Sequence, residues 1–189
     1  MPVINVTLIA GYDDATRQRL CERLTDAAMA TISAPAEAVT VFITEVQPTS
    51  YMRGREAKVP APPPAPPGEL CLDFLDALGA REIDRAEALI GDGFEMIFPG
   101  PVRFTGFSEL MAWAAPRYRT IGKKIARVDE APLGETVAVY VTGTLIGEKP
   151  DGTPFEDIRF IDRFEVRAGK IIRQEVWNDL ADPGVTGTG

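Results

Sequence analysis

The residues of this chain best placed to transfer protons are Pro2 and Asp162, because the sequence contains no histidine. The absence of histidine excludes Ser-His-Asp and Cys-His catalysis and argues against a zinc site. Proton transfer must then come from carboxylates, tyrosines, lysines or the amino terminus. The two cysteines, Cys21 and Cys71, are not at the spacing of metal ligands. The sequence therefore predicts an enzyme without a metal or other cofactor.

Pro2 is a candidate base because of its position next to the initiator. If Met1 is removed, Pro2 presents a free secondary amine, and an apolar pocket disfavours the charged form of such an amine. The neutral amine can take a proton beside a carbonyl group and return it elsewhere, or attack the carbonyl as a nucleophile. If Met1 is retained, Pro2 is a tertiary amide and has neither ability.

Asp162 lies in an alternating segment that predicts a strand, where it shares a face with Phe160 and Phe164. A carboxylate among aromatic side chains is desolvated, which suits a general acid or base inside a cavity. The alternative is a structural carboxylate that pairs with Arg159 or with a tyrosine hydroxyl.

Residues 1–56 form the first predicted domain. Alternation over residues 3–9 predicts a strand, Asp13 or Asp14 is positioned to cap a helix that ends before Pro35, and the apolar run 39–44 predicts a buried parallel strand. This β-α-β unit is too small to bury both faces of its sheet, so it is expected to self-associate.

This segment resembles the 4-oxalocrotonate tautomerase family through Pro2, the turn at Gly11, the amphipathic helix, the Ala34-Pro35 step and the strand end 42–45. The resemblance implies that Pro2 is the catalytic base or acid.

The resemblance also implies substrate-binding residues near that proline. Tyr51 stands where the family places an aromatic wall of the pocket, whereas Tyr12 and Thr40 stand where it places arginines that bind carboxylates. Arg53 is a candidate for supplying a positive charge instead. A less charged carbonyl or enol compound is therefore expected in place of a dicarboxylate, and a catalytically silent domain stays open as an alternative.

A proline-rich segment, residues 57–68, follows the first domain. Proline lacks the amide donor that a helix interior or a central strand needs, so this segment predicts a semi-rigid linker. Residues 69–181 form the second predicted domain, and residues 182–189 a flexible tail. The predicted fold class of the whole chain is α+β.

The second domain begins with helical patterns at 70–79, 84–90 and 107–118, and four apolar strand segments follow between residues 125 and 177. Three helices on a curled antiparallel sheet are expected. The segments 74–82, 106–113, 150–171 and 174–180 resemble the nuclear transport factor 2-like superfamily, especially its SnoaL-like branch. The resemblance implies a cone-shaped barrel with a cavity, and Trp113, Tyr140 and Trp177 are interpreted as its core or cavity lining.

The composition limits the partners of the chain. A net charge of −8, with no basic cluster, argues against nucleic acid, and no apolar run reaches the length of a membrane span. No signal-peptide pattern opens the sequence, so a cytoplasmic protein is expected. A small-molecule substrate and a homo-oligomer, either a hexamer or a dimer, are the remaining predictions.

Three functions follow from these patterns. The leading hypothesis is a fused isomerase in which Pro2 is the catalyst and the second domain supplies a ligand cavity. The second hypothesis places catalysis at Asp162 and makes the first domain an oligomerisation platform. The third is a ligand-binding or assembly protein without catalysis.

Overall fold

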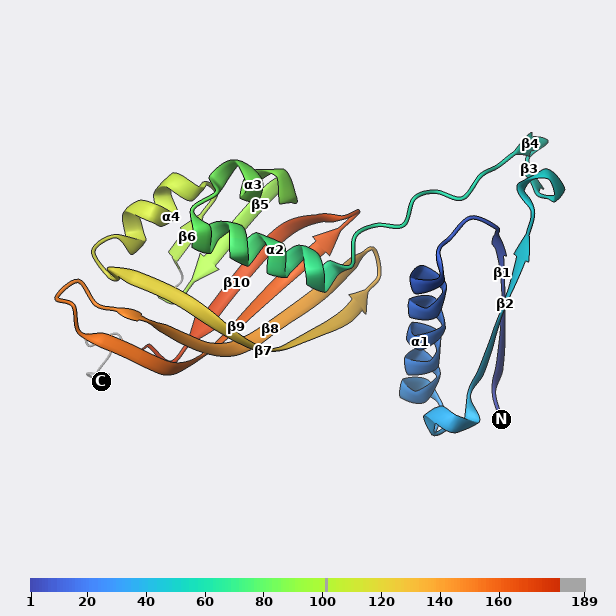
Figure 1. Cartoon of the computed structure of the whole chain (residues 1–189), viewed down its shortest axis with the longest axis horizontal. Helices are drawn as coiled ribbons and strands as arrows, with labels where there is room; N and C mark the ends of the chain where they lie inside the picture. Colours follow the sequence, from blue (N-terminus) through green and yellow to red (C-terminus); the bar gives the residue numbers. More distant parts are fainter. Residues whose placement is uncertain (101, 181–189) are drawn as a thin grey trace. The chain divides into compact units, whose positions relative to one another are not determined.

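The computed structural model describes residues 1–100 and 102–180, so the predicted tail and residue 181 lie outside the described residues. The chain divides into two compact units, Met1–Pro63 and Pro64–Gly189, each of which is described by itself (Figure 1). Within the described residues, no helix has both the length and the apolar character needed to cross a membrane.

The first unit is a β-α-β element followed by a small hairpin. Strands β1 (Val3–Ile9) and β2 (Thr40–Val46) are parallel, and helix α1 (Asp14–Thr31) connects them. Short 3-10 turns at Ala36–Ala38 and Pro48–Ser50 flank β2, and β3 (Met52–Arg53) pairs with β4 (Glu56–Ala57). The parallel pairing confirms the expected topology.

Local interactions explain where α1 begins and how it meets the sheet. The carboxylate of Asp13 accepts a hydrogen bond of 2.8 Å from the backbone N–H of Thr16, which satisfies a donor that the first turn leaves free. Arg17 then forms an ion pair with Glu45 of β2. Helix α1 therefore covers the side of the sheet that carries the half-buried residues of β1.

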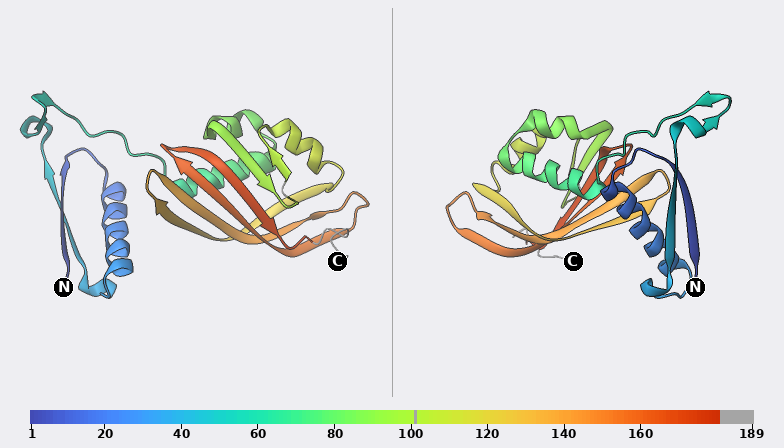
Figure 2. Two further views of the ribbon diagram at one scale, coloured as in Figure 1. Left: turned by 180° about the vertical axis from the view of Figure 1, so that it is seen from behind. Right: turned by 45° about the vertical axis from the view of Figure 1, so that its right-hand side comes forward.

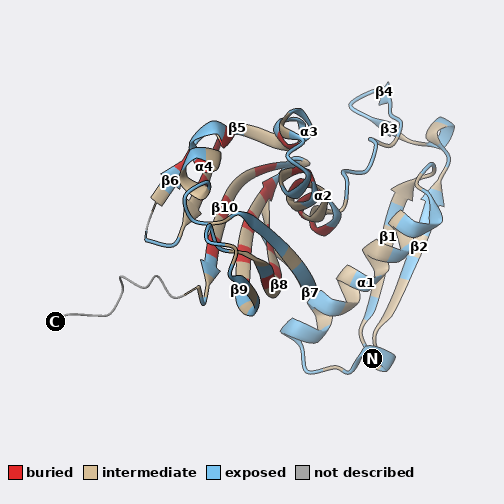
Figure 3. Cartoon of the chain, turned by 60° about the vertical axis from the view of Figure 1, so that its left-hand side comes forward, coloured by how far each residue is buried: buried red, intermediate tan, exposed pale blue. Residues whose placement is uncertain are grey.

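The other side of this two-stranded sheet is uncovered. None of residues 1–63, all of which the structure describes, is buried, and Val3 and Phe42 are 55% and 54% exposed. The expectation of a buried β2 is therefore wrong for a single copy, because one helix can cover only one face. Figure 3 shows that the buried positions gather in the second unit.

The second unit places three helices against a six-stranded sheet of order β6-β5-β10-β9-β8-β7. The helices are α2 (Pro67–Ala80), α3 (Ile83–Leu89) and α4 (Phe107–Ala114). The strands are β5 (Ile90–Phe98), β6 (Val102–Phe104), β7 (Thr120–Leu133), β8 (Thr136–Glu148), β9 (Pro154–Arg167) and β10 (Lys170–Asn178). The sheet curls, and all three helices lie on its concave side (Figures 1 and 2). The predicted α+β class is confirmed.

The structure corrects three details of the second unit. Strand β10 pairs in parallel with β5, so the sheet is mixed and not antiparallel. The chain passes through β6, β7, β8 and β9 between these two strands, which lets β10 return beside β5 in the same direction. Strand β6 was not predicted, since three residues carry too short a pattern. Helix α2 begins at Pro67, inside the predicted linker, because proline lacks only a donor that the first helical turn leaves unused.

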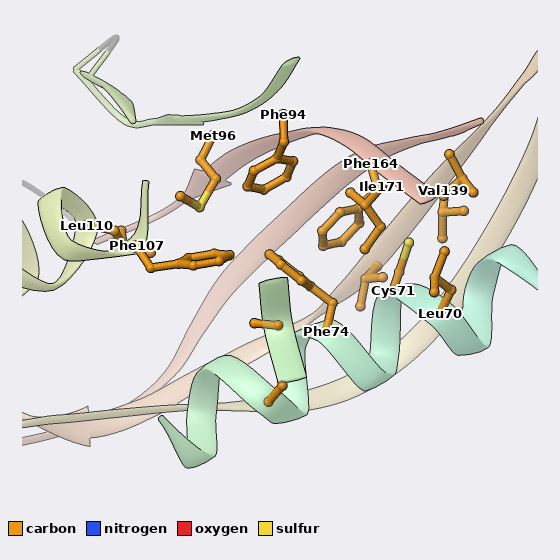
Figure 4. Packing of buried hydrophobic residues seen from close by; sticks show 14 of the residues in the cluster. Leu70, Cys71, Phe74, Phe94, Met96, Phe107, Leu110, Val139, Phe164 and Ile171 are labelled. Atoms are coloured by element: carbon orange, nitrogen blue, oxygen red, sulfur yellow. The ribbon is translucent and has the colours of Figure 1, made fainter. Parts of the chain in front are cut away.

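An aromatic core holds α2 against the sheet. The ring of Phe74 meets Phe94 at 5.7 Å and Phe164 at 5.9 Å, both edge-to-face, and Phe107 at 6.0 Å. Figure 4 shows Phe74 pointing from α2 toward these rings. Edge-to-face contacts add to the gain from burial, so this cluster fixes the helix that forms one side of the cavity described next.

Candidate functional site

The second unit contains a cavity of about 1030 Å³ between its helices and its sheet. Most of its lining is apolar and comes from α2, α4 and the start of β7, and Arg81 and Arg119 are among the charged lining residues. Tyr118 is also part of the lining, as is Trp113, which was interpreted from the sequence as core or cavity lining. A cavity of this size and character suits a small apolar molecule.

Asp162 lies beneath the lining of this cavity. Its side chain is fully buried, and its cross-strand neighbours are Val141 of β8 and Val176 of β10. Phe160 and Phe164, on the same face of β9, are also buried. The predicted apolar surroundings of this carboxylate are therefore confirmed.

Two polar side chains of the cavity lining approach the carboxylate. Lys123 of β7 forms an ion pair with Asp162 Oδ2, and Gln174 Nε2 of β10 donates to the same oxygen at 3.2 Å. The alternative pairing with Arg159 is wrong, because Arg159 binds Asp179 at 2.6 Å. The ion pair offsets part of the cost of burying the carboxylate.

The remaining oxygens of this cluster have no partner. Asp162 Oδ1 and Gln174 Oε1 are buried and accept no hydrogen bond within the described part of the chain. An unsatisfied buried acceptor is costly, so such atoms usually mark a place for water or a ligand. Two unpaired acceptors therefore belong to the cluster of Lys123, Asp162 and Gln174, of which Lys123 and Gln174 line the cavity.

Close contact between β7 and β8 shapes the part of the sheet that carries Lys123. The register of β7 shifts between Ile125 and Arg127, opposite Gly143 of β8. A Cβ atom at Gly143 would lie 2.0 Å from the carbonyl oxygen of Lys124. Only glycine permits this approach, which brings the two backbones together just after Lys123.

Trp113 is the predicted site residue that the structure places in the cavity wall. Its ring packs edge-to-face against Phe98 and Phe104 at 5.4 and 5.6 Å. Its indole Nε1 is buried and has no partner within the described residues. Trp113 therefore lines the cavity, and its unpaired donor lies buried within the wall.

Tyr140 and Trp177 do not line this cavity, which corrects the interpretation made from the sequence. Trp177 is 50% exposed, and Tyr140 pairs in register with Arg163, whose side chain lies among charges. Both residues occupy the strand positions that alternate with the cavity-facing ones, so they point to the outer face of the sheet.

Lys123 and Gln174 were missed from the sequence. Gln174 alternates with the buried Val176, and a polar residue at an apolar position was the available signal. Lys123 carried no such signal, because it precedes an equally basic neighbour, Lys124, which is exposed.

The first unit separates the predicted site residues into two groups. Pro2 is half-buried, and its carbonyl oxygen accepts from the N–H of Thr40 at 3.0 Å, so both stand at the amino ends of β1 and β2. Tyr12, Tyr51 and Arg53 follow the carboxyl ends of these strands. A strand of seven residues spans about 23 Å, so one copy does not bring the two groups together.

The outer face of the sheet carries a network of charges. Arg173 binds Glu175 at 2.7 Å and pairs with Glu95, while Arg163 binds Glu165 and Glu175 at 2.7 and 3.1 Å. Burial opposes the ionisation of Glu175, but Arg173 and Arg163 outweigh it and lower the pKa of this carboxyl. The described residues contain no cluster of cysteine and carboxylate side chains that could hold a metal ion.

Comparison with known proteins gives matches for both units. The family model of the SnoaL-like domain matches residues 72–174, more than half of the chain, and that of the tautomerase enzymes matches residues 2–59. No curated protein matches the chain.

Solved structures also match part of the chain. TerC, crystallised with polyporic acid, is 19% identical over 59% of this chain and 89% of its own, with a TM-score of 0.49. An NTF2-like protein of unknown function from Burkholderia pseudomallei is 14% identical over 59% of this chain and 88% of its own, with the same TM-score of 0.49.

Both matched families consist in general of isomerases and cyclases. The chain belongs to the SnoaL-like domain family and carries a tautomerase domain ahead of that domain.

Proposed function

We propose that the SnoaL-like domain catalyses proton transfer on an apolar carbonyl or enol compound, with Asp162 as general acid and base. The observation that carries this proposal is the buried carboxylate beneath a large apolar cavity, with its Oδ1 free of partners within the described residues. Lys123 supplies a positive charge that stabilises an enolate oxygen, and Gln174 orients the carboxylate. The reaction class is isomerisation or cyclisation through an enol.

The test is deuterium exchange at the carbon beside the carbonyl of 2-tetralone, followed by NMR in heavy water. Asp162→Asn is expected to slow the catalysed exchange by about 100-fold, since it removes the base and keeps the shape. Asp157→Asn is the matched control, because Asp157 lies on the same strand, is exposed and has a positive φ that asparagine tolerates. Equal exchange rates in the two variants would contradict the proposal.

A second function is supported for the first unit. The match of residues 2–59 to tautomerase enzymes and the position of Pro2 at the head of β1 support a proline-dependent tautomerase. Pro2 and Thr40 stand at one end of the strands and Tyr51 and Arg53 at the other, so a complete pocket needs a second copy to supply the missing group. A homo-oligomer, either a hexamer or a dimer, is part of this proposal.

This second function has its own test. Intact-mass measurement shows whether Met1 is removed, and ketonisation of phenylenolpyruvate measures the activity. Pro2→Ala is expected to lower this rate by about 100-fold, while Asp162→Asn leaves it unchanged. Retention of Met1, or an undiminished rate in Pro2→Ala, would overturn it.

A further inference from the structure

Lys123 has chemical ability that the proposed proton transfer does not use. Among the described residues that line the cavity, it is the one that carries an amine. Its side chain is 23% exposed, and its Nζ lies against the Asp162 carboxylate and 4.7 Å from the centre of the Phe160 ring. This nitrogen therefore combines access to the cavity with a single charged partner.

A direct hydrogen bond joins the amine of Lys123 to the carboxylate of Asp162. Nζ already donates to Asp162 Oδ2, so a proton that moves along this hydrogen bond converts the ion pair into a neutral amine and a neutral acid. Phe160, Val141 and Val176 around Asp162 are buried and apolar, so the ion pair lies against apolar side chains. The neutral amine is a nucleophile at the cavity floor.

The unpaired acceptors nearby fit the product of nucleophilic attack. Asp162 Oδ1 and Gln174 Oε1 are buried without partners in the described parts of the chain. When an amine adds to a carbonyl, the carbonyl oxygen becomes a hydroxyl, which is a donor. Lys123 Nζ and Gln174 Nε2 both donate to Asp162 Oδ2, so the two unpaired oxygens belong to the side chains around the attacking nitrogen, and either one accepts this hydrogen bond once its side chain turns toward the cavity.

We propose that Lys123 forms a Schiff base with the carbonyl group of an apolar ketone or aldehyde in the cavity. The nitrogen bonds to the carbonyl carbon, and Asp162 passes the transferred proton to the carbonyl oxygen. That oxygen then leaves as water with two of the three ammonium hydrogens. The third hydrogen stays on the iminium nitrogen, so the total charge is unchanged and the Asp162 carboxylate is restored.

The iminium deepens the proposed function, on which this inference rests. Its positive charge draws electrons from the neighbouring C–H bond. Asp162 takes that proton, the C–H electron pair forms a C=C bond, and the C=N π electrons return to nitrogen. Reprotonation and addition of water then release the isomerised carbonyl compound. Lys123 is a catalytic residue in this scheme.

Reductive trapping tests the covalent step. The full-length chain is treated with 2-naphthaldehyde and sodium cyanoborohydride, which reduces an iminium to a stable secondary amine, and the labelled residue is identified by peptide mass mapping. We expect the label on Lys123, with protection by 2-tetralone and complete loss of that label in Lys123→Arg. Arginine keeps the positive charge beside Asp162, so the variant retains the ion pair.

Lys124→Arg is the matched control, because Lys124 is the exposed neighbour of Lys123 and does not line the cavity. It is expected to leave the labelling of Lys123 unchanged. A label on Pro2 falls in a different peptide and is counted separately. Labelling of Lys123 no faster than that of Lys124 would overturn the inference.

The tetralone exchange separates this inference from the proposed function. Loss of exchange by about 100-fold in both Asp162→Asn and Lys123→Arg supports the Schiff base. Loss in Asp162→Asn alone overturns the Schiff base and leaves the proposed function standing. Exchange that persists in both variants overturns both.

Discussion

The two units of this chain differ in what one copy can bury. In the second unit, helix α2 packs Phe74 among three other aromatic rings, and the same helix then forms one side of a cavity. In the first unit, α1 covers one face of two strands and leaves Phe42 half exposed on the other. A single copy therefore encloses a cavity in the second unit, whereas the first unit leaves one face of its sheet uncovered.

The largest effect is expected from a core aromatic residue of the second unit. Phe74→Ala removes a fully buried ring and is expected to lower the free energy of unfolding by about 3–5 kcal/mol. Urea unfolding followed by the fluorescence of Trp113 and Trp177 reports on this unit, since both tryptophans lie in it. Phe42→Ala is the matched control and should leave this transition unchanged. A loss below that range would contradict the importance of the aromatic core.

A smaller effect is expected where two strands of the second unit approach most closely. Gly143→Ala places a methyl group against the backbone of Lys124 and is expected to cost about 1–3 kcal/mol. It should also lower the tetralone exchange rate, because the strand segment that holds Lys123 must shift. Gly79→Ala is the control, since nothing lies within 4 Å of the added carbon. Equal stability of the two variants would argue against the close approach.

The next prediction tests whether the uncovered sheet face of the first unit mediates self-association. Phe42→Asp introduces a charge there and is expected to weaken self-association by about 1.5–3 kcal/mol for each buried ring that is lost. Light scattering over a concentration series measures this change as a shift to smaller species. Val59→Asp is the control, because Val59 is 76% exposed in the proline-rich segment. An identical mass distribution for Phe42→Asp and the unmodified chain would contradict the role of this face.

The smallest expected effect is on how the free energy of unfolding depends on pH, through Glu175 on the outer face of the second unit. The pKa of Glu175 is lowered by Arg173 and Arg163 despite burial, so the folded chain binds this proton less readily than the unfolded chain. The ionised Glu175 stabilises the folded chain fully when the pH lies above 4.5, the ordinary pKa of a glutamate. This stabilisation is lost as the pH falls below that value and through the lowered pKa of the folded chain. Glu175→Gln should therefore reduce the acid dependence of the unfolding free energy below about pH 4.5. An unchanged slope in that variant would refute this assignment.

Alternation predicted the buried carboxylate but not its partners. The position of Asp162 between Phe160 and Phe164 is a property of one strand, so the sequence shows it directly. Its contact with Lys123 joins residues 39 positions apart and depends on how far β7 curls over the sheet, which no local pattern encodes. Tyr140 and Trp177 were assigned to the wrong face because aromatic type was given more weight than strand alternation.

The first unit shows the same limit in another form. The sequence predicts its strands, its helix and a cap at Asp13 or Asp14, because these depend on neighbouring residues, and the structure shows that Asp13 is the cap. It does not place Pro2 relative to Tyr51, and the structure sets these residues at opposite ends of the strands in one copy. Local patterns in the sequence do not record how far apart the two ends of a strand bring such residues.

The central claim is that an apolar ketone exchanges its protons in the cavity of the second unit and not at the amino terminus. The direct measurement is the tetralone exchange rate of Asp162→Asn beside that of Pro2→Ala, at equal concentration and with folding checked by urea unfolding. We expect a loss of about 100-fold in Asp162→Asn and an unchanged rate in Pro2→Ala. An unchanged rate in Asp162→Asn with a loss in Pro2→Ala would contradict it.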